Sequence, residues 1–299
     1  MIDIYAEKSK NIKEKKMDEK LVKQLEIDAA KIRIGVIEGV HSAKAGHPGG
    51  SLSCADLLAY LYMHRLNADP SEPDCSTRDR VVLSKGHAAP ALYAALALRG
   101  FFPMEEMNTL RKIGSRLQGH PDCKKTPGID FSTGSLGQGI SGACGMALSG
   151  KISCESYKVY AILGDGEIEE GMVWEAAMFA SHYMLDNLVA VVDNNNLQID
   201  GKVNEVLSPY PIDEKFKAFG WHVININGHD FNEMEKAFNE AETVVHKPTV
   251  IIMRTTKGKG VDYMEDALDW HGKAPGDADY ERAIKQLKEH LAELEGSVD

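Results

Sequence analysis

The chain has 299 residues, of which 43% are hydrophobic and 26% are charged, as in an ordinary soluble globular protein. Its net charge of −11 disfavours a nucleic-acid-binding surface, which would require a basic balance. The sequence has no apolar run of membrane-spanning length, and its charged N-terminal segment lacks the apolar core of a signal peptide. The five cysteines are odd in number and include no Cys-x-x-Cys pair, which disfavours a disulfide or zinc framework and favours the reducing cytoplasm.

The N-terminal third is predicted to be mainly helical. Residues 1–16 are expected to form a polar arm, and residues 17–299 a single α/β domain. Apolar residues at three- and four-residue spacing, with breakers between them, predict the elements of this third. These are a helix over 17–45, an amphipathic helix from Ser51 or Ser53 to Leu66, a strand at 81–83, a helix that Gly100 ends, and a helix from Pro103 to about Ile113.

A helix of small residues follows the glycine-rich segment 132–139. Its sequence, ISGACGMALSG, has glycines in the helix interior, each of which costs up to about 1 kcal/mol. Such glycines are expected where another backbone or a cofactor comes very close. A loosely packed, flexible helix would have the same composition, so the sequence leaves both interpretations open.

The central stretch of the chain contains a strand–helix–strand unit. An apolar strand over 159–163 ends in Gly-Asp-Gly, a helix is predicted over 171–185, and a second strand over 188–192 ends in Asp-Asn-Asn-Asn. The two strands of such a unit lie parallel, so their ends meet at the same edge of the sheet. Asp165 and Asn195 are therefore both expected at the carboxyl edge, where open α/β sheets bind ligands.

The rest of the chain continues the alternation of strands and helices. The predicted elements are a short helix between 203 and 220, a strand over 221–226, a helix over 231–245, a strand over 249–254, and a charged amphipathic helix over 278–294. This alternation favours a mostly parallel sheet sandwiched by helices, and the predicted fold class is therefore α/β.

A magnesium and diphosphate site is predicted at the carboxyl edge. Asp165 offers a carboxylate, Asn195 an amide oxygen and Leu197 a backbone carbonyl, a set that suits Mg²⁺ when phosphate oxygens complete it. Gly166 lets the backbone approach a phosphate, and the N-terminus of the following helix favours an anion. The alternative is an acidic turn and an unrelated polar loop, which is less specific because both segments flank one helix.

Four histidines lie in loops beside glycine or proline: His47, His87, His120 and His271. Their spacing does not suit zinc, and no cysteine joins them. They could share a site in which they donate hydrogen bonds to a sugar phosphate and move protons near neutral pH. They could equally be four separate solvated side chains, and the residues alone leave both interpretations open.

Seven motifs occur in the order found in transketolases: GHPGG, SKGHA, QGHPD, STGSLGQG, GDGEIEEG, DNNNLQIDG and WHGKAP. They span residues 46–275, and GDG with a later asparagine pair resembles the thiamine diphosphate signature. The chain therefore resembles the N-terminal, diphosphate-binding part of a transketolase. The resemblance implies a thiamine diphosphate-binding fold of the PP type, with thiamine diphosphate and Mg²⁺ as cofactors, or Ca²⁺ or Mn²⁺ in place of Mg²⁺.

The resemblance also implies which residues hold the cofactor. The metal ligands of the family match Asp165, Asn195 and the backbone carbonyl of Leu197, which stands where isoleucine is common. Gly166 and Asn195 match its diphosphate contacts. His87 matches a histidine beside the diphosphate and the reacting centre.

Further roles are implied around the cofactor rings and the substrate. The loop against the thiazolium and pyrimidine region matches Gly134, Ser135 and Leu136, with Ser135 where many members have proline. Substrate-contacting histidines match His47, His120 and His271, and His271 also lies with the diphosphate contacts. Glu170 matches a buried acid near the cofactor, which in the family connects to the neighbouring active site.

A pyrimidine-binding domain is the part of a transketolase that this sequence lacks. In the family that domain supplies the glutamate that activates the cofactor and the arginines that grip the substrate phosphate, and this chain ends at Asp299. We therefore expect a partner subunit with that domain, in an α₂β₂ assembly. Together they would transfer a two-carbon ketol unit from a ketose phosphate to an aldose phosphate, without nucleic acid or membrane.

Four alternatives share parts of this pattern. An E1 component of a 2-oxo-acid dehydrogenase also has GDG and an asparagine pair, but not the GHPGG and SKGHA motifs. A deoxyxylulose-phosphate synthase is expected to be longer, with differently spaced histidines. A specialised sugar transketolase would look the same in this half, and a non-catalytic cofactor-binding subunit is distinguished only by an assay with a partner.

Overall fold

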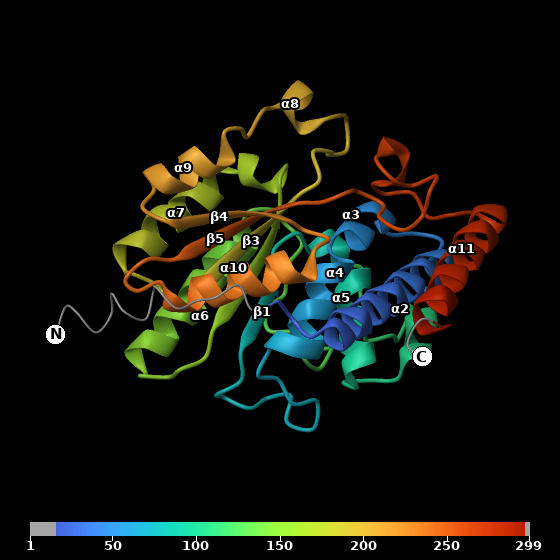
Figure 1. The fold of residues 1–299 in the computed structure, drawn as a ribbon, viewed down its shortest axis with the longest axis horizontal. Helices are drawn as coiled ribbons and strands as arrows, with labels where there is room; N and C mark the ends of the chain where they lie inside the picture. Colours follow the sequence, from blue (N-terminus) through green and yellow to red (C-terminus); the bar gives the residue numbers. More distant parts are fainter. Residues whose placement is uncertain (1–15, 297–299) are drawn as a thin grey trace.

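The computed structural model of the chain describes residues 16–296. Five strands form one sheet in the order β1-β2-β3-β5-β4, and every neighbouring pair is parallel. The strands are β1 (Arg80–Leu83), β2 (Val159–Gly164), β3 (Leu188–Asn194), β4 (His222–Asn227) and β5 (Thr249–Arg254) (Figure 1). The prediction of an α/β fold with a mostly parallel sheet is confirmed.

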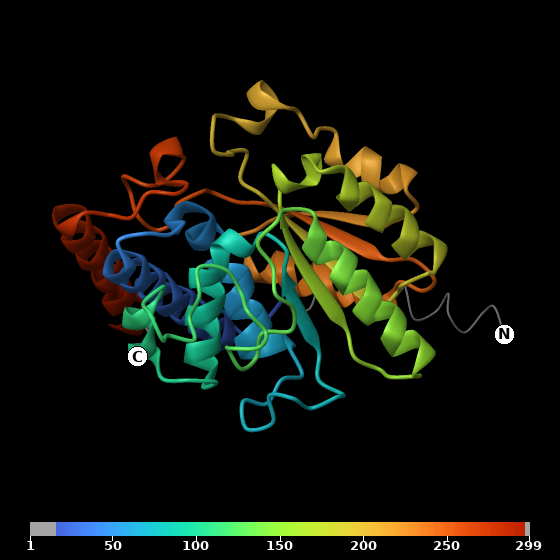
Figure 2. The same ribbon diagram turned by 180° about the vertical axis from the view of Figure 1, so that it is seen from behind.

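Helices cover both faces of the sheet (Figures 1 and 2). One face packs against α2 (Glu19–Ala43), α4 (Ala55–Tyr60), α5 (Ala89–Arg99) and α10 (Phe231–Thr243). The other face packs against α6 (Gln138–Ile152), α7 (Gly171–His182) and α9 (Ile212–Ala218). The last helix, α11 (Asp277–Gly296), lies along α2. Because both faces are covered, the central strands are apolar at almost every position, as the sequence predicted.

The predicted helix from Ser51 or Ser53 to Leu66 begins earlier and is interrupted. It consists of α3 (Pro48–Ser53) and α4, which meet at Cys54, and it continues as a π-helical turn over Leu61–Arg65. Pro48 suits the first helical position because its missing N–H would have no partner there. Residues 48–62 are all buried, so the segment is an internal helix and not the amphipathic one predicted.

Other predicted elements differ in smaller ways. The predicted helix from Pro103 is a 3₁₀ helix over Met104–Thr109, and Arg111 then adopts the left-handed conformation with φ 59°, which no helix continues. The region between 203 and 220 contains α8 (Val203–Val206) as well as α9. The remaining predicted helices and strands agree within a few residues, and Gly100 ends α5 with φ 104° as predicted.

The predicted polar arm falls almost wholly on residues 1–15, which lie outside the described part of the chain. The single-domain boundary at residue 17 stays a prediction. Within residues 16–296, no helix is both long and apolar enough to cross a lipid bilayer.

Candidate active site

The carboxyl ends of β2 and β3 open into a pocket of about 220 Å³. Gly164 at the end of β2 pairs with Asp193 in β3, so the turns that follow the two strands lie side by side. Most of the predicted site residues line this pocket: His47, His87, Gly134, Leu136, Asp165, Gly166, Asn195, Leu197 and His271. The fold therefore assembles the predicted edge site from loops that are far apart in the sequence.

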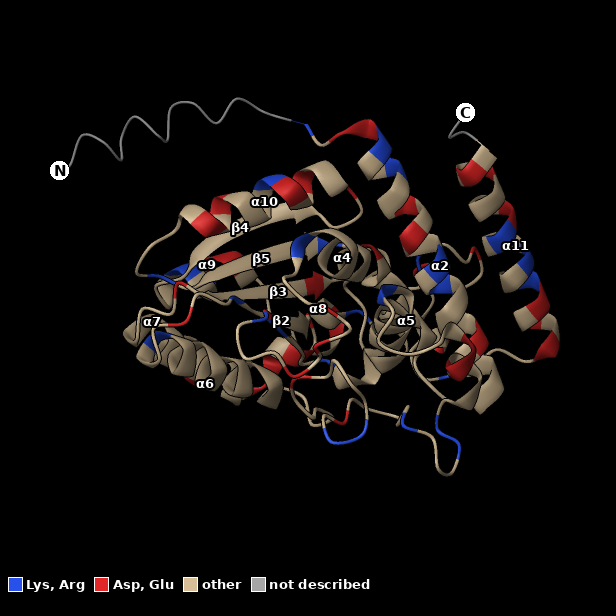
Figure 3. Cartoon of the chain, turned by 90° about the horizontal axis from the view of Figure 1, so that it is seen from below, with Lys and Arg blue, Asp and Glu red and all other residues tan. Residues whose placement is uncertain are grey.

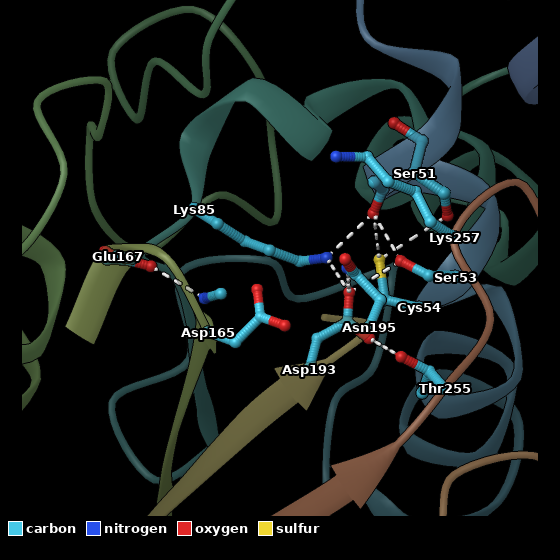
Figure 4. Close-up of polar contacts among 12 residues, drawn as sticks. Ser51, Ser53, Cys54, Lys85, Asp165, Glu167, Asp193, Asn195, Thr255 and Lys257 are labelled. Atoms are coloured by element: carbon cyan, nitrogen blue, oxygen red, sulfur yellow. Dashed lines mark hydrogen bonds and ion pairs between the residues drawn. The ribbon is translucent and has the colours of Figure 1, made fainter. Parts of the chain in front are cut away.

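Asp165 joins the two turns in the pocket (Figure 4). Its carboxylate accepts the backbone N–H of Gly166 at 2.9 Å and that of Asn196 in the neighbouring turn. The residue is only 2% exposed, and burial together with the Asp193 carboxylate raises the pKa of Asp165 to about 7. A bound cation would offset both effects, so this carboxylate suits a metal ligand.

Asn195 and Leu197 provide neutral oxygens beside Asp165. Oδ1 of Asn195 accepts the Leu197 N–H at 3.2 Å, and the carbonyl of Leu197 accepts from the Lys257 ammonium at 2.9 Å. One carboxylate and two neutral oxygens fit Mg²⁺ when diphosphate and water fill its other positions. In residues 16–296 no group of three or more His, Cys, Asp or Glu side chains could hold a metal ion by itself.

A buried ion pair beneath this edge was missed by the sequence analysis (Figure 4). Lys85, which follows β1, contacts the Asp193 carboxylate and donates to the carbonyl of Gly50 at 2.7 Å. Ser53 and Thr255 also donate to that carboxylate. Burial alone would raise the pKa of Asp193, but the ion pair with Lys85 holds it below its ordinary value. Both charged residues lie in motifs that were noted, SKGHA and DNNN, without a role.

Lys257 is a second cation that the sequence analysis left without a role. It lies in the glycine-rich turn after β5, is 1% exposed, and reaches Nδ1 of His271 at 2.7 Å as well as the Leu197 carbonyl. Burial lowers the pKa of Lys257 to about 8, against the opposing attraction of Asp165. The available signal was a lysine in a glycine-rich turn at the same sheet edge as GDG.

His47, His87 and His271 form a cluster in the pocket wall, with ring centroids 5.2 to 5.6 Å apart. Burial lowers the pKa of His47 to about 4, that of His271 to about 3, and that of His87 well below its ordinary value. All three rings are therefore neutral at pH 7, so each can donate one hydrogen bond and accept another. Nδ1 of His47 is buried without a partner among the described residues, which leaves it available to a ligand.

His120 and Ser135 lie beside the pocket and do not line it. Both are exposed, and a Cβ built on Gly134 would lie 3.6 Å from the His120 ring. His120 therefore packs behind the pocket wall, at its rim. Its contact with a substrate stays a prediction.

Glu170 is not the buried acid that the resemblance implied. It is the N-cap residue of α7 and is exposed in the described chain. The buried acid of this segment is Glu167, 2% exposed, whose carboxylate accepts the N–H groups of Gly137 at 3.0 Å and Gly164 at 2.9 Å. A 3₁₀ turn over Glu167–Glu169 places one glutamate inside and the other at the surface, which residue spacing alone does not predict.

Comparisons with known proteins agree with this fold and site. A family model for the thiamine diphosphate binding domain of transketolase matches residues 24–293. The chain is 43% identical over 274 residues to one subunit of the apulose-4-phosphate transketolase of Phocaeicola vulgatus, which covers 92% of this chain and 97% of that protein. It is 44% identical over 268 residues to the 6-deoxy-6-sulfo-D-fructose transketolase subunit SqwG of a Clostridium species, with coverage of 90% and 98%.

Longer transketolases are similar over part of their length. Human transketolase is 45% identical over 262 residues, which are 86% of this chain but 41% of that protein. The solved structure of Campylobacter jejuni transketolase superposes with a TM-score of 0.81 at 30% identity, covering 94% of this chain and 48% of that one. The chain belongs to the transketolase family, as an N-terminal, thiamine diphosphate-binding subunit of the kind found in two-subunit transketolases.

Proposed function

We propose that this chain, together with a subunit that carries a pyrimidine-binding domain, transfers a two-carbon ketol unit from a ketose phosphate to an aldose phosphate. Thiamine diphosphate, when bound, supplies the nucleophilic carbon needed to cleave and form the carbon–carbon bond beside the substrate carbonyl. The observation that carries the proposal is one pocket that combines the buried Asp165 carboxylate, neutral oxygens, the Lys257 cation and three neutral histidines.

The diphosphate end of the cofactor would be held at the two turns. Asp165, Asn195 and the Leu197 carbonyl would bind Mg²⁺, or Ca²⁺ or Mn²⁺ in its place. The Leu197 carbonyl accepts from Lys257, and its second lone pair would serve the metal. Gly166 and Asn195 would contact the diphosphate, and the Lys257 ammonium would balance part of its charge.

The remaining predicted residues would surround the rings and the substrate. His87 and His271 would lie beside the diphosphate and the reacting carbon, and Gly134, Ser135 and Leu136 would support the rings. The substrate would be held by the imidazoles of His47, His120 and His271. As neutral groups these histidines can donate a hydrogen bond to a carbonyl or hydroxyl oxygen and take a proton back.

An exposed apolar surface supports the proposal of a partner subunit. Met172, Met178 and Phe179 recur at helical spacing on α7 and are 39%, 55% and 37% exposed. Figure 3 shows that α6, beside α7, carries almost no charge, in contrast to α10 and α11. Glu170 begins α7 and is exposed, which suits a contact with a neighbouring active site. We propose that this surface meets the partner in an α₂β₂ assembly.

Positive charge near the pocket supports an anionic substrate. Arg111 lies against Gly119, next to His120, and together with burial its charge lowers the pKa of His120. A surface hollow of about 450 Å³ is lined by four cations, Arg111, Lys112, Arg116 and Lys125. In a chain of net charge −11, this cluster favours sugar phosphates over neutral sugars. The substrates in the names of the two subunit relatives are also anionic.

The setting of the reaction is part of the proposal. All five cysteines are free, which supports a reducing, cytoplasmic environment. Ketose and aldose phosphates as substrates would assign the enzyme to carbohydrate metabolism of the pentose phosphate type.

Reconstitution tests the proposal. The chain is mixed with a candidate pyrimidine-domain protein, thiamine diphosphate, Mg²⁺, a ketose phosphate and an aldose phosphate, and transfer of the two-carbon unit is measured. We expect transfer only when both proteins are present. Absence of transfer with every plausible partner would contradict the proposed activity, and transfer by the chain alone would contradict the need for a partner.

A further inference from the structure

A chain of polar contacts crosses the interior behind the pocket and ends at the turn that carries Lys257. Arg33 of α2 donates to the Asp56 carboxylate of α4 at 2.6 Å. The same carboxylate contacts Nδ1 of His229 at 2.6 Å, and Nε2 of His229 accepts the backbone N–H of Thr256 at 2.9 Å. His229 lies between β4 and α10, in a segment that the sequence analysis treated as an ordinary turn.

The hydrogen bonds define the state of the His229 ring. Because Nε2 accepts a backbone N–H, the ring proton lies on Nδ1 and is donated to Asp56. Burial alone would raise the pKa of Asp56, but Arg33 and His229 outweigh it and lower the pKa to about 2. Asp56 is therefore a fixed anion that orients the imidazole, so Nε2 points at the backbone of the turn after β5.

The turn over residues 255–258 is fastened at each residue around Lys257. Thr255 donates to Asp193, and the N–H of Gly258 donates to the carbonyl of Gly49 at 3.0 Å. Gly258 has φ 78°, and a Cβ there would lie 2.1 Å from the carbonyl oxygen of Met264, so no other residue fits. His229 provides the contact at Thr256, immediately before the lysine.

We propose that His229 is a positioning residue for the cofactor site, because its acceptance of the Thr256 N–H holds the turn that places the Lys257 ammonium against the Leu197 carbonyl. The inference rests on the proposed cofactor site. It assigns His229 a role that reaches the diphosphate through Lys257, without contact of its own.

Two substitutions separate the contacts of the ring. His229→Gln has an amide oxygen that can reach the position of Nε2 and accept the Thr256 N–H. His229→Asn is shorter and can keep only the Asp56 contact. We measure binding of inorganic diphosphate with Mg²⁺ to the full chain by calorimetry, and expect His229→Asn to weaken it about tenfold and His229→Gln by less than about threefold. Equal affinity of His229→Asn and wild type would overturn the inference.

A double-mutant cycle excludes a merely structural role. In a Lys257→Ala chain, His229→Asn should weaken diphosphate binding by less than about twofold, because the group that His229 positions is gone. A tenfold loss in both backgrounds would overturn the inference. If His229→Asn does not fold, His229→Ala takes its place in the same cycle. Failure of the wild-type chain to bind diphosphate with Mg²⁺ would contradict the proposed cofactor site itself.

Discussion

At the scale of single residues, Asp165 is expected to control retention of the cofactor. Asp165→Ala removes the one carboxylate of the proposed ligand set and should weaken Mg²⁺-dependent binding of thiamine diphosphate roughly 100-fold, about 2.7 kcal/mol. Calorimetry measures the affinity, and circular dichroism verifies that the fold is intact. Asp74→Ala, an exposed carboxylate in the loop before β1, is the matched control. Unchanged cofactor affinity of Asp165→Ala would refute the metal assignment.

His271 leads to a prediction about pH. Its pKa of about 3 in the folded chain lies below the ordinary 6.5, so the unfolded chain binds the proton first as pH falls. The free energy of unfolding should therefore be fully present above pH 6.5 and decrease as pH falls below it. We expect the urea midpoint to fall less steeply from pH 7 to pH 5 in His271→Asn than in wild type. His290→Asn, at an exposed site on α11, is the control, and identical slopes for His271→Asn and wild type would contradict the argument.

At the scale of elements, the glycines of α6 have distinct roles. A Cβ on Gly139 would lie 2.6 Å from Cα of Ser84, whereas Gly145 has open space around it. Gly139 therefore permits α6 to approach the end of β1, which settles in favour of close contact the two interpretations that the sequence left open. Gly142, whose Cβ would lie 2.7 Å from the Phe131 ring, agrees.

The two positions form a matched pair for a stability measurement. Gly139→Ala forces α6 away from Ser84 and should lower the free energy of unfolding by about 2 kcal/mol. Gly145→Ala should raise it by up to about 1 kcal/mol, because alanine is the better helix former and nothing within the chain obstructs it. Chemical denaturation measures both variants. Equal effects of the two substitutions would show that close packing is not the reason for the glycines.

At the scale of the whole molecule, the pocket suits the diphosphate better than the rings. The proposed metal ligands and Lys257 lie at the closed end, while Ser135 and Leu136 are exposed. In this chain alone, with Mg²⁺, thiamine diphosphate and inorganic diphosphate should bind with affinities within about threefold of each other. Addition of the partner should strengthen thiamine diphosphate binding at least about tenfold by burying the rings, and leave diphosphate binding unchanged. Calorimetry of both ligands decides, and an equal gain for both would contradict this division.

The sequence by itself determined the order of strands and helices and the edge at which the site lies. Apolar runs and their spacing are local properties, and two consecutive parallel strands necessarily bring GDG and DNNN to one edge. The same reasoning predicted that Asp165, Asn195 and Leu197 share one site, and all three line one pocket. The family followed from motifs that survive as short contiguous strings.

Only the tertiary structure decided which charged groups meet and which face the interior. Lys85 and Asp193 are 108 residues apart, and their contact depends on how β1 and β3 lie around β2. Within GDGEIEEG, a 3₁₀ turn decides that Glu167 is buried and Glu170 is exposed. Such outcomes depend on side-chain direction and on contacts between distant segments, because the cost of burying a charge is set by its neighbours in space and not by its neighbours in sequence.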